Sequence, residues 1–306
     1  MFAVRYMIYT VTFNPALDYT IWAGDISDGG VIRMTRQKIF CGGKGINVSL
    51  ILKELGLESI ALGFVAGFTG DEIMRQIDEA GVNSGFIRLK DGYTRINVKI
   101  KANPEVDLNA PGPDIDDEAL EMLFDKLDTL EDEDSLVLAG SIPKSMPDDI
   151  YEQIMERLSD RKINIVVDAT GSLLSNVLKY HPFLIKPNNF ELEEIVGRKL
   201  PDDQALAEAA KELQSMGAKN VLVSLGGDGA LLLDETGEVS RIGVAPCPMV
   251  NSVGAGDSMV AGFLAGYLQS NDYKYALKLG TVCGGATANS EGLAKRKRIE
   301  ELLKLL

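Results

Sequence analysis

Glycines surround an aspartate near the end of the chain, in a pattern that can stabilise an anion. Residues 253–258 read VGAGDS, and the apolar run 259–268 that follows them predicts a helix. The first backbone amides of a helix have no partner within it and lie at the positive end of its dipole, so they suit a phosphoryl group. A carboxylate at this place has two interpretations. Either Asp257 caps the helix, or it is the general base for an acceptor hydroxyl.

A second glycine-rich segment lies nearer the start of the chain. Residues 41–47 read CGGKGIN and directly precede a predicted helix. The backbone of Gly42 and Gly43 can therefore approach a ligand closely, and Lys44 can neutralise a phosphate. The sequence lacks the Walker A spacing, in which a glycine, four residues and Gly-Lys-Ser/Thr follow one another. A nucleotide site in this protein must therefore be of another kind.

Residues 186–191, which read KPNNFE, lead from a predicted strand into a predicted helix. Asn188 and Glu191 are one turn apart on the same side of that helix, where their oxygens suit Mg²⁺ held mostly through water. The same spacing is typical of a capping box, with Asn188 at the N-cap and Glu191 three residues later. Spacing alone supports the capping box at least as well as the metal site.

Two further loops are candidates for ligand contact. Residues 224–230 read SLGGDGA between two apolar stretches, which predicts a plain hairpin turn or a loop whose backbone lies against a nucleotide. Residues 14–18 end the first predicted strand, where polar groups face the ligand crevice of a parallel sheet and Asp18 can bind sugar hydroxyls. The single histidine, His181, precedes a proline and favours a structural role. Any catalytic base must then be a carboxylate.

The elements that position these residues alternate along the chain. Short apolar runs bounded by turn residues predict strands, and amphipathic stretches between them predict crossover helices, which together indicate a parallel sheet. The last third of the chain is predicted to be helical. The predicted strands are 8–13, 60–65, 136–139, 163–167 and 221–225, and the predicted helices are 48–55, 71–80, 148–158, 204–216, 256–268, 273–289 and 297–305.

One segment alternates apolar and polar residues with the two-residue period of a strand. Residues 94–101 place Ile96, Val98 and Ile100 on one face and basic or amide side chains on the other. This pattern predicts a half-buried antiparallel strand whose basic face can hold an anion. An ordinary surface strand, with lysines such as Lys99 blunting a sheet edge, is the alternative.

Residues 18–40 also lack helical periodicity. We interpret the segments at about 18–40 and 92–111 as a small accessory sheet that covers a cleft. The whole of 1–306 is then expected to be a single domain with this sheet inserted in it.

The composition limits the possible partners. The 306 residues are 45% hydrophobic and carry a net charge of −14, which provides a large core and argues against a nucleic-acid surface. A phosphate site must therefore be a local basic pocket in an acidic body. The 3 cysteines have no metal-ligand spacing, and no apolar run has the length of a signal peptide or membrane span. These features predict a cytoplasmic protein without a membrane partner.

Taken together, the motifs resemble the ribokinase-like sugar kinases of the phosphofructokinase B family along nearly the whole chain. The segments 42–47 and 253–258 have the order and spacing of that family's two glycine-rich signatures. The resemblance implies a three-layer α/β fold with a mostly parallel central sheet and a small β-sheet lid. It also implies ATP as co-substrate, Mg²⁺ as cofactor and a homodimer formed through the lid.

The resemblance further implies a role for each matching residue. Asp257 would be the catalytic base, and the anion hole for the migrating phosphoryl group would be made by Gly254, Ala255 and Gly256. The residues implied to place the metal are Asn188 and Glu191. The implied nucleotide contacts are Lys186, Ser224, Gly226, Gly229 and Asn289. The implied substrate contacts are Asp18, Gly42, Gly43, Lys44, Asn47, Arg95 and Arg33.

Within that family the chain is most similar to members that act on phosphorylated sugars. The implied reaction is ATP-dependent phosphorylation of fructose 1-phosphate to fructose 1,6-bisphosphate. Cations such as Lys44 and Arg95 in a sugar pocket agree with a phosphorylated substrate. Tagatose 6-phosphate kinase activity and a catalytically silent sugar-phosphate sensor are the alternatives. One departure concerns residues 251–252, which are Asn-Ser where many members have Asp-Thr, so a monovalent-cation site that depends on that aspartate is left open.

Overall fold

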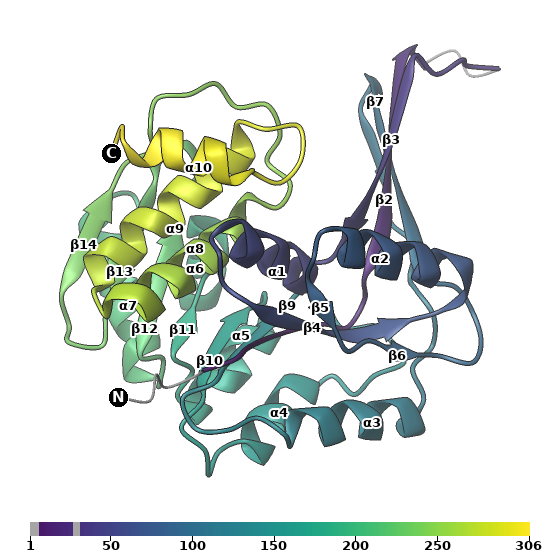
Figure 1. Cartoon of the computed structure of the whole chain (residues 1–306). Coiled ribbons are helices and arrows are strands. Elements are labelled where there is room, and N and C mark those ends of the chain that lie inside the picture. Colours follow the sequence, from purple (N-terminus) through teal and green to yellow (C-terminus); the bar gives the residue numbers. More distant parts are fainter. Residues whose placement is uncertain (1–5, 27–30) are drawn as a thin grey trace.

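The computed structural model describes residues 6–26 and 31–306, and a large central sheet organises it (Figure 1). Most of its strands run parallel, from β12 across to β5, whereas β13 and β14 are antiparallel additions at one edge. The predicted parallel sheet is therefore confirmed. In spatial order the strands are β14 (Val239–Ile242), β13 (Ala230–Leu233), β12 (Asn220–Ser224), β11 (Leu184–Ile185), β10 (Asn164–Asp168), β9 (Ser135–Ala139), β1 (Ile8–Thr12), β4 (Ser59–Val65) and β5 (Asn83–Ser84), with β6 (Ile87–Arg88) paired to β4.

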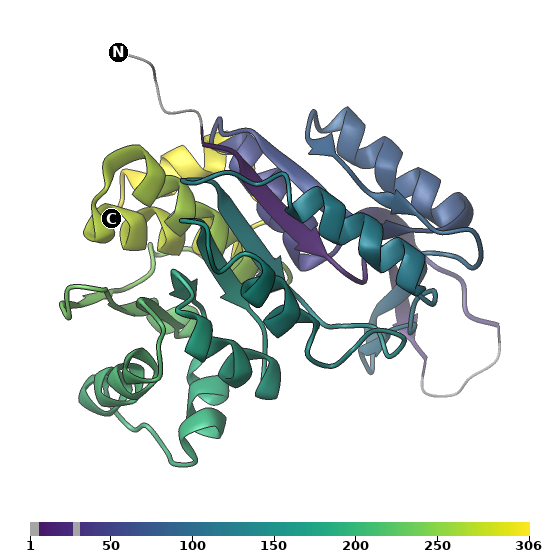
Figure 2. The same ribbon diagram turned by 90° about the horizontal axis from the view of Figure 1, so that it is seen from below.

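Helices cover both faces of this sheet, which gives three layers (Figure 2). Buried strand residues alternate between the two helical layers, so that Leu136 and Leu138 of β9 pack in one core and Val137 in the other. One layer contains α3 (Asp117–Leu127), α4 (Ile150–Arg157), α5 (Ser172–Val177), α6 (Asn189–Val196) and α7 (Asp203–Ser215). The other contains α1 (Lys44–Glu54), α2 (Gly67–Glu79), α8 (Ala255–Ser270), α9 (Tyr273–Ala288) and α10 (Arg296–Leu303).

A second, smaller sheet projects from the body (Figure 1) and confirms the predicted accessory sheet. Its order is β3-β2-β7-β8, with bounds of Ala16–Asp25 for β2, Arg36–Gly42 for β3, Arg95–Asn103 for β7 and Val106–Leu108 for β8. We call it the lid sheet. Part of the predicted lid segment, residues 27–30, lies outside the described residues.

The sequence predicted an antiparallel β7 with a buried apolar face, and the structure confirms only part of this. This strand pairs in parallel with β2 and is antiparallel only to the short β8. Asn97 is 8% exposed and Ile96 is 40% exposed, the reverse of the expected burial. The reason is that the polar face of the lid sheet turns toward the body, while its apolar face turns outward. Period two identified two faces but could not say which one would be covered.

The sequence also missed the helices α3 and α5 and the short strands β5, β6 and β14, and it placed the starts of α1 and α2 four residues late. Elsewhere, helix and strand bounds agree with the predictions to within a few residues, as is usual for element ends. Among the described residues, no helix is both long and apolar enough to cross a membrane.

Candidate active site

A cavity of about 850 Å³ opens where the lid sheet meets the carboxyl ends of the parallel strands. The strands β1, β9, β10 and β12 each contribute their last residue to its wall. Ligand crevices of parallel sheets lie at this edge because the strands there end in loops and helix N-termini. One end of the cavity lies beneath the lid sheet and the other near α9, with the first turn of α8 between them. We call them the sugar end and the nucleotide end, after the ligands that the sequence predicts for their residues.

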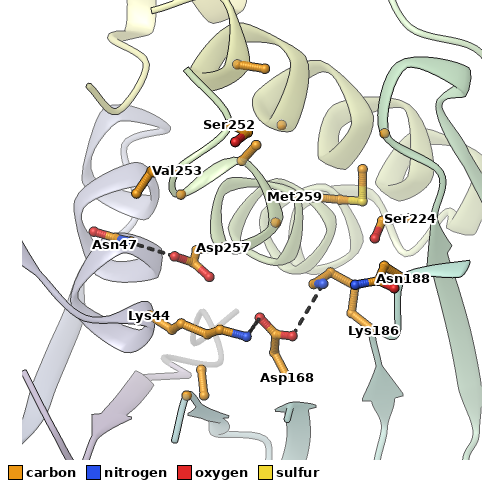
Figure 3. A pocket seen from close by; sticks show the side chains of 18 of the residues that line it. Lys44, Asn47, Asp168, Lys186, Asn188, Ser224, Ser252, Val253, Asp257 and Met259 are labelled. Atoms are coloured by element: carbon orange, nitrogen blue, oxygen red, sulfur yellow. Dashed lines mark hydrogen bonds and ion pairs between the residues drawn. The ribbon is translucent and has the colours of Figure 1, made fainter. Parts of the chain in front are cut away.

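Asp257 lies in the first turn of α8 and is 6% exposed. Its Oδ2 accepts a hydrogen bond of 2.7 Å from Nδ2 of Asn47, at the start of α1 (Figure 3). The N-cap of α8 is Gly254, with φ of 80° and no side-chain capping bond, so the capping alternative for Asp257 is wrong. Burial, reinforced by nearby Asp168, raises the pKa of Asp257 to about 6, although Asn47 opposes the shift. The carboxyl group can therefore exchange a proton near neutral pH.

Asp168, which the sequence reasoning missed, is the second buried carboxylate of the site. It ends β10, is 3% exposed, and its two oxygens lie 3.3 Å from Nζ of Lys44 and 3.3 Å from Nζ of Lys186 (Figure 3). Burial opposes its ionised form, but the two ammonium groups hold its pKa below the ordinary value. The available signal was positional: a polar residue directly after a predicted buried strand, at the same sheet edge as the other site residues.

The anion site between these groups depends on backbone conformation. Gly254 has a left-handed φ, and a Cβ there would lie 2.6 Å from Cδ2 of Leu293. The amide of Ala255 donates to the carbonyl of Ser252 at 3.3 Å. Within the described residues, the amides of Gly254, Gly256 and Asp257 have no backbone partner and are available to an anion. These amides, Lys44 and Lys186 bring positive charge to the middle of the cavity.

Asn188 and Glu191 form the capping box that the sequence left as an alternative. The Asn188 Oδ1 accepts from the Glu191 amide at 2.8 Å, and the Glu191 Oε2 accepts from the Asn188 amide at 2.8 Å. Both residues also line the cavity. No cluster of three His, Cys, Asp or Glu side chains that could hold a metal ion occurs in residues 6–26 or 31–306. The donor set therefore fits a cation that keeps most of its ligands as water and phosphate oxygens, as Mg²⁺ does.

The sugar end of the cavity is built by the lid sheet. The Asp18 Oδ1 accepts a hydrogen bond of 3.0 Å from Nδ2 of Asn97, and Nζ of Lys99 lies 3.5 Å from Oδ2 of Asp18. The Oδ1 of Asn97 is buried without a partner among the described residues. A Cβ at Gly42 would lie 2.6 Å from Oδ2 of Asp18, so Gly42 makes room for that carboxylate and does not itself line the cavity.

Of the two arginines predicted to contact the substrate, only one lines the cavity. Arg95 lines the cavity, and its guanidinium donates to the carbonyl of Asn14 at 3.1 Å and to that of Ala110 at 3.4 Å. Burial lowers the pKa of Arg95 from its ordinary value. Arg33 is exposed and lies outside the cavity wall, so its substrate contact stays a prediction that the cavity lining does not support.

At the nucleotide end, the loop 224–230 is the hairpin between β12 and β13, and Ser224 and Gly226 line the cavity. Gly229 does not line it: a Cβ there would lie 2.0 Å from the carbonyl oxygen of Ile242, so this glycine serves the packing of β14. His181 lies outside the cavity, with its Nδ1 3.1 Å from the carbonyl oxygen of Gly217, in agreement with a structural role.

Asn289 lines the nucleotide end, but its side chain is already engaged. Its Nδ2 donates to the Pro248 carbonyl at 2.6 Å, and its Oδ1 accepts from Nε of Arg298 at 2.8 Å. These bonds join the end of α9 to the facing loop and to α10, and the predicted nucleotide contact of Asn289 stays a prediction.

Comparison with known proteins identifies relatives along almost the whole chain. A family model described as pfkB family carbohydrate kinase matches residues 11–298. The chain is 42% identical to a 1-phosphofructokinase from Bacillus subtilis, over 97% of either chain. It is 33% identical to a D-tagatose-1-phosphate kinase from Bacillus licheniformis, over 96% of this chain and 97% of that one.

Solved structures agree with this. Phosphofructokinase-2 from Escherichia coli in complex with fructose-6-phosphate superposes with a TM-score of 0.90 at 27% identity, over 98% of this chain and 99% of that one. Arabidopsis thaliana ribokinase complexed with ribose and ATP has a TM-score of 0.79 at 18% identity, over 98% of this chain and 99% of that one, a likeness of fold alone. The expected three-layer fold with a small second sheet is confirmed.

Proposed function

The chain belongs to the pfkB family of carbohydrate kinases, and from this premise we propose that it transfers the γ-phosphoryl group of ATP to the C6 hydroxyl of fructose 1-phosphate. The products would be ADP and fructose 1,6-bisphosphate. The observation that carries the proposal is the position of Asp257, a buried carboxylate beside free helix amides and two lysines, in a cavity that has cations at its sugar end as well.

Asp257 is the proposed general base. A carboxylate with a pKa of about 6 is mostly ionised at neutral pH, and it remains basic enough to accept the proton of a hydroxyl that is forming a bond to phosphorus. The hydrogen bond from Asn47 fixes its orientation. As the O6–Pγ bond forms, the bond from Pγ to the bridging oxygen of ADP breaks, and the proton passes to Asp257.

The negative charge of the transferred group falls among fixed positive groups. The amides of the first turn of α8 point at this position, and Lys44 and Lys186 lie beside it on Asp168. Preorganised donors of this kind stabilise developing charge without reorganising during the reaction. Phosphoryl transfer is catalysed chiefly by such positioning and electrostatics. Mg²⁺, when held through water by Asn188 and Glu191, would neutralise phosphate charge at the nucleotide end.

The sugar end supports a phosphorylated substrate. Lys99 is partly buried beside Asp18, and the guanidinium of Arg95 is fixed by two carbonyls, so both cations are held in place before a ligand arrives. Charge-assisted bonds from such groups bind phosphate strongly. The carboxylate of Asp18 and the amide oxygen of Asn97 can accept bonds from sugar hydroxyls.

The relatives bear on the choice between the alternative sugars. The two described above are named for fructose and tagatose substrates that carry phosphate at C1. This favours a 1-phosphate over the tagatose 6-phosphate considered from the sequence. A silent sensor is disfavoured because a binding protein has no need of a base that faces a phosphoryl group.

The lid sheet supports a homodimer. Ile39 pairs with Tyr19, which pairs with Val98, which pairs with Leu108, so these residues form one outward-facing apolar row. Ile39 is 51% exposed and Leu108 is 55% exposed. A row of exposed apolar side chains on a sheet is typical of a protein interface. We infer that a second copy of the chain covers it.

The deciding experiment measures ADP release with Mg·ATP and each of five acceptors: fructose 1-phosphate, tagatose 1-phosphate, tagatose 6-phosphate, fructose 6-phosphate and fructose. A kcat/KM that is highest for fructose 1-phosphate would support the proposal. Preference for a 6-phosphate would move the assignment to another member of the family. Saturable binding of sugar phosphates without turnover of any acceptor would favour the sensor.

A further inference from the structure

Two cations on the lid sheet point toward the body without lining the cavity. Arg36 and Lys38 of β3 lie on the same face as Lys99, because Lys38 pairs with Thr20 and Thr20 with Lys99. The Arg36 guanidinium donates to both carboxylate oxygens of Glu291, at 3.0 Å and 2.7 Å, and Nζ of Lys38 lies 2.5 Å from Oε2. These contacts join the lid sheet to a segment more than 250 residues later in the chain.

Glu291 lies in the turn between α9 and α10, on the side of the body that faces β3 (Figure 1). The turn is anchored: the Glu291 carbonyl accepts from Nδ2 of Asn251 at 3.2 Å, and the Asn251 amide donates to the Ala288 carbonyl at 3.0 Å. The Oδ1 of Asn251 also accepts from the Val253 amide at 3.1 Å, next to the anion site. Glu291 therefore holds the lid sheet to the loop that carries the phosphoryl-binding amides.

We propose that Glu291 is a positioning residue, whose carboxylate draws the lid sheet toward the body and so favours the closed arrangement in which the sugar phosphate is bound. The inference rests on the proposed function, in which the lid sheet covers the sugar end. Arg36 and Lys38 lower the pKa of Glu291 to about 2, so the carboxylate is charged at every pH at which the enzyme would be assayed.

A contact of this kind can matter for binding although it matters little for folding. The three side chains are 35% to 51% exposed, and ion pairs between exposed groups change stability only slightly. In this proposal the lid sheet exchanges between an open and a closed arrangement, of which only the closed one binds the sugar phosphate. The apparent affinity for a ligand that binds one of them falls in proportion to the fraction of molecules in that arrangement. A small loss of attraction therefore changes ligand affinity several-fold.

The test replaces Glu291 with glutamine, which keeps the shape and the backbone bond to Asn251 but removes the charge. We expect the KM for the sugar phosphate to rise about three- to tenfold, with kcat and the KM for ATP within about twofold of the unsubstituted enzyme. Added salt should raise the sugar-phosphate KM of both proteins, because the substrate itself is charged, but more steeply for the unsubstituted enzyme than for the variant. Glu291→Asp, which keeps the charge on a shorter side chain, should recover part of the affinity.

The control is Glu238→Gln, directly before β14, which removes an exposed carboxylate 2.7 Å from Nζ of Lys274, away from the cavity. It should leave both KM values unchanged. Equal changes of kcat and of both KM values in Glu291→Gln would indicate a general structural defect and overturn the proposal. An unchanged sugar-phosphate KM at low salt would also overturn it.

A second measurement needs no catalysis. The chain has 1 tryptophan, Trp22, and the Arg36 guanidinium lies 4.6 Å from the centre of its ring. Glu291→Gln should change the emission of Trp22 in the absence of ligands, whereas Glu238→Gln should not. Identical emission from the unsubstituted protein and Glu291→Gln would contradict the tether. If no sugar phosphate is turned over, the proposed function fails, and the emission measurement still decides whether Glu291 holds the lid sheet.

Discussion

The two ends of the cavity satisfy their polar groups differently. In the middle and toward the nucleotide end, the buried carboxylates have side-chain partners: Asp168 lies beside two lysines, and Asp257 accepts a hydrogen bond from Asn47. At the sugar end, the amide oxygen of Asn97 is buried without a partner among the described residues. A buried polar atom without a partner costs free energy, so a bound ligand that supplies the partner is favoured there. Under the proposed function, the first region carries out the chemistry and the second recognises the sugar phosphate.

The two regions also lie on different scaffolds, one covered by helices and one projecting from the body. The reacting groups lie on strand ends and helix N-termini of the central sheet, which is covered by helices on both faces. The recognition groups lie on a projecting four-stranded sheet with one face uncovered in this chain. Substitutions in the first region should therefore change kcat, and substitutions in the second should change KM, specificity or assembly.

The largest expected effect is that of Asp257→Asn. The substitution keeps the shape of the side chain but removes the proposed base, so kcat should fall at least roughly a hundredfold while both KM values change little. The thermal midpoint should be maintained, since a buried charge is removed. Steady-state kinetics and a melting curve check both points. Near-normal turnover would show that Asp257 is not the base.

Substitutions at the sugar end should raise the KM for the sugar phosphate. Lys99→Met removes the ammonium group but keeps most of the side-chain length, and the KM for fructose 1-phosphate should rise about tenfold to a hundredfold, as expected for the loss of a charge-assisted bond. The kcat at saturation should change much less. Lys101→Met is the matched control, because Lys101 lies further along the same strand, pairs with Glu105 and does not line the cavity. A fall in kcat without a change in KM would place Lys99 in the reacting region instead.

The pH dependence connects the two buried carboxylates. The proposed base must be ionised, so kcat should fall on the acid side with a limb near pH 6. Because Asp168 helps to raise the pKa of Asp257, Asp168→Asn should move this limb to lower pH. The ion pairs of Asp168 also stabilise the fold while it is ionised, a contribution present at neutral pH and lost as pH falls through its depressed pKa. A limb that stays in place in Asp168→Asn would exclude coupling between the two groups.

The smallest effect on chemistry should come from the outward face of the lid sheet. Ile39→Glu places a charge in the apolar row and should convert a dimer to monomers, with kcat changed only a few-fold. Sedimentation velocity measures the assembly. The control is Met122→Glu on α3, which is 47% exposed and lies outside the lid sheet. An unsubstituted protein that sediments as a monomer at assay concentrations would refute the inferred dimer.

The sequence predicted those features best that a pattern of neighbouring residues determines. Apolar runs flanked by turn residues located the strands of the central sheet, and the glycines at 42–43 and 254–256 located two helix N-termini. These features are local: a strand is apolar because it is buried on both faces, and a glycine is needed where φ is positive. Of the residues that the resemblance proposed for the site, Arg33, Gly42 and Gly229 are the ones that do not line the cavity.

The sequence failed where the partner is distant along the chain. Asp168 shows its importance only when β10 brings it between Lys44 and Lys186, and the Nδ2 of Asn289 donates to Pro248, 41 residues earlier in the chain. The inverted face of β7 is a failure of the same kind, since period two is identical for either orientation.

By itself, then, the sequence determined the parallel sheet, the positions of the two glycine-rich signatures and the presence of an accessory sheet, because each follows from periodicity or from backbone freedom within a few residues. Only the tertiary structure decided which carboxylates are buried together, how far their pKa values shift, which face of the lid sheet meets the ligand and which glutamate holds that sheet to the body. Those properties depend on distances between segments far apart in the chain, and electrostatic energies change steeply with such distances.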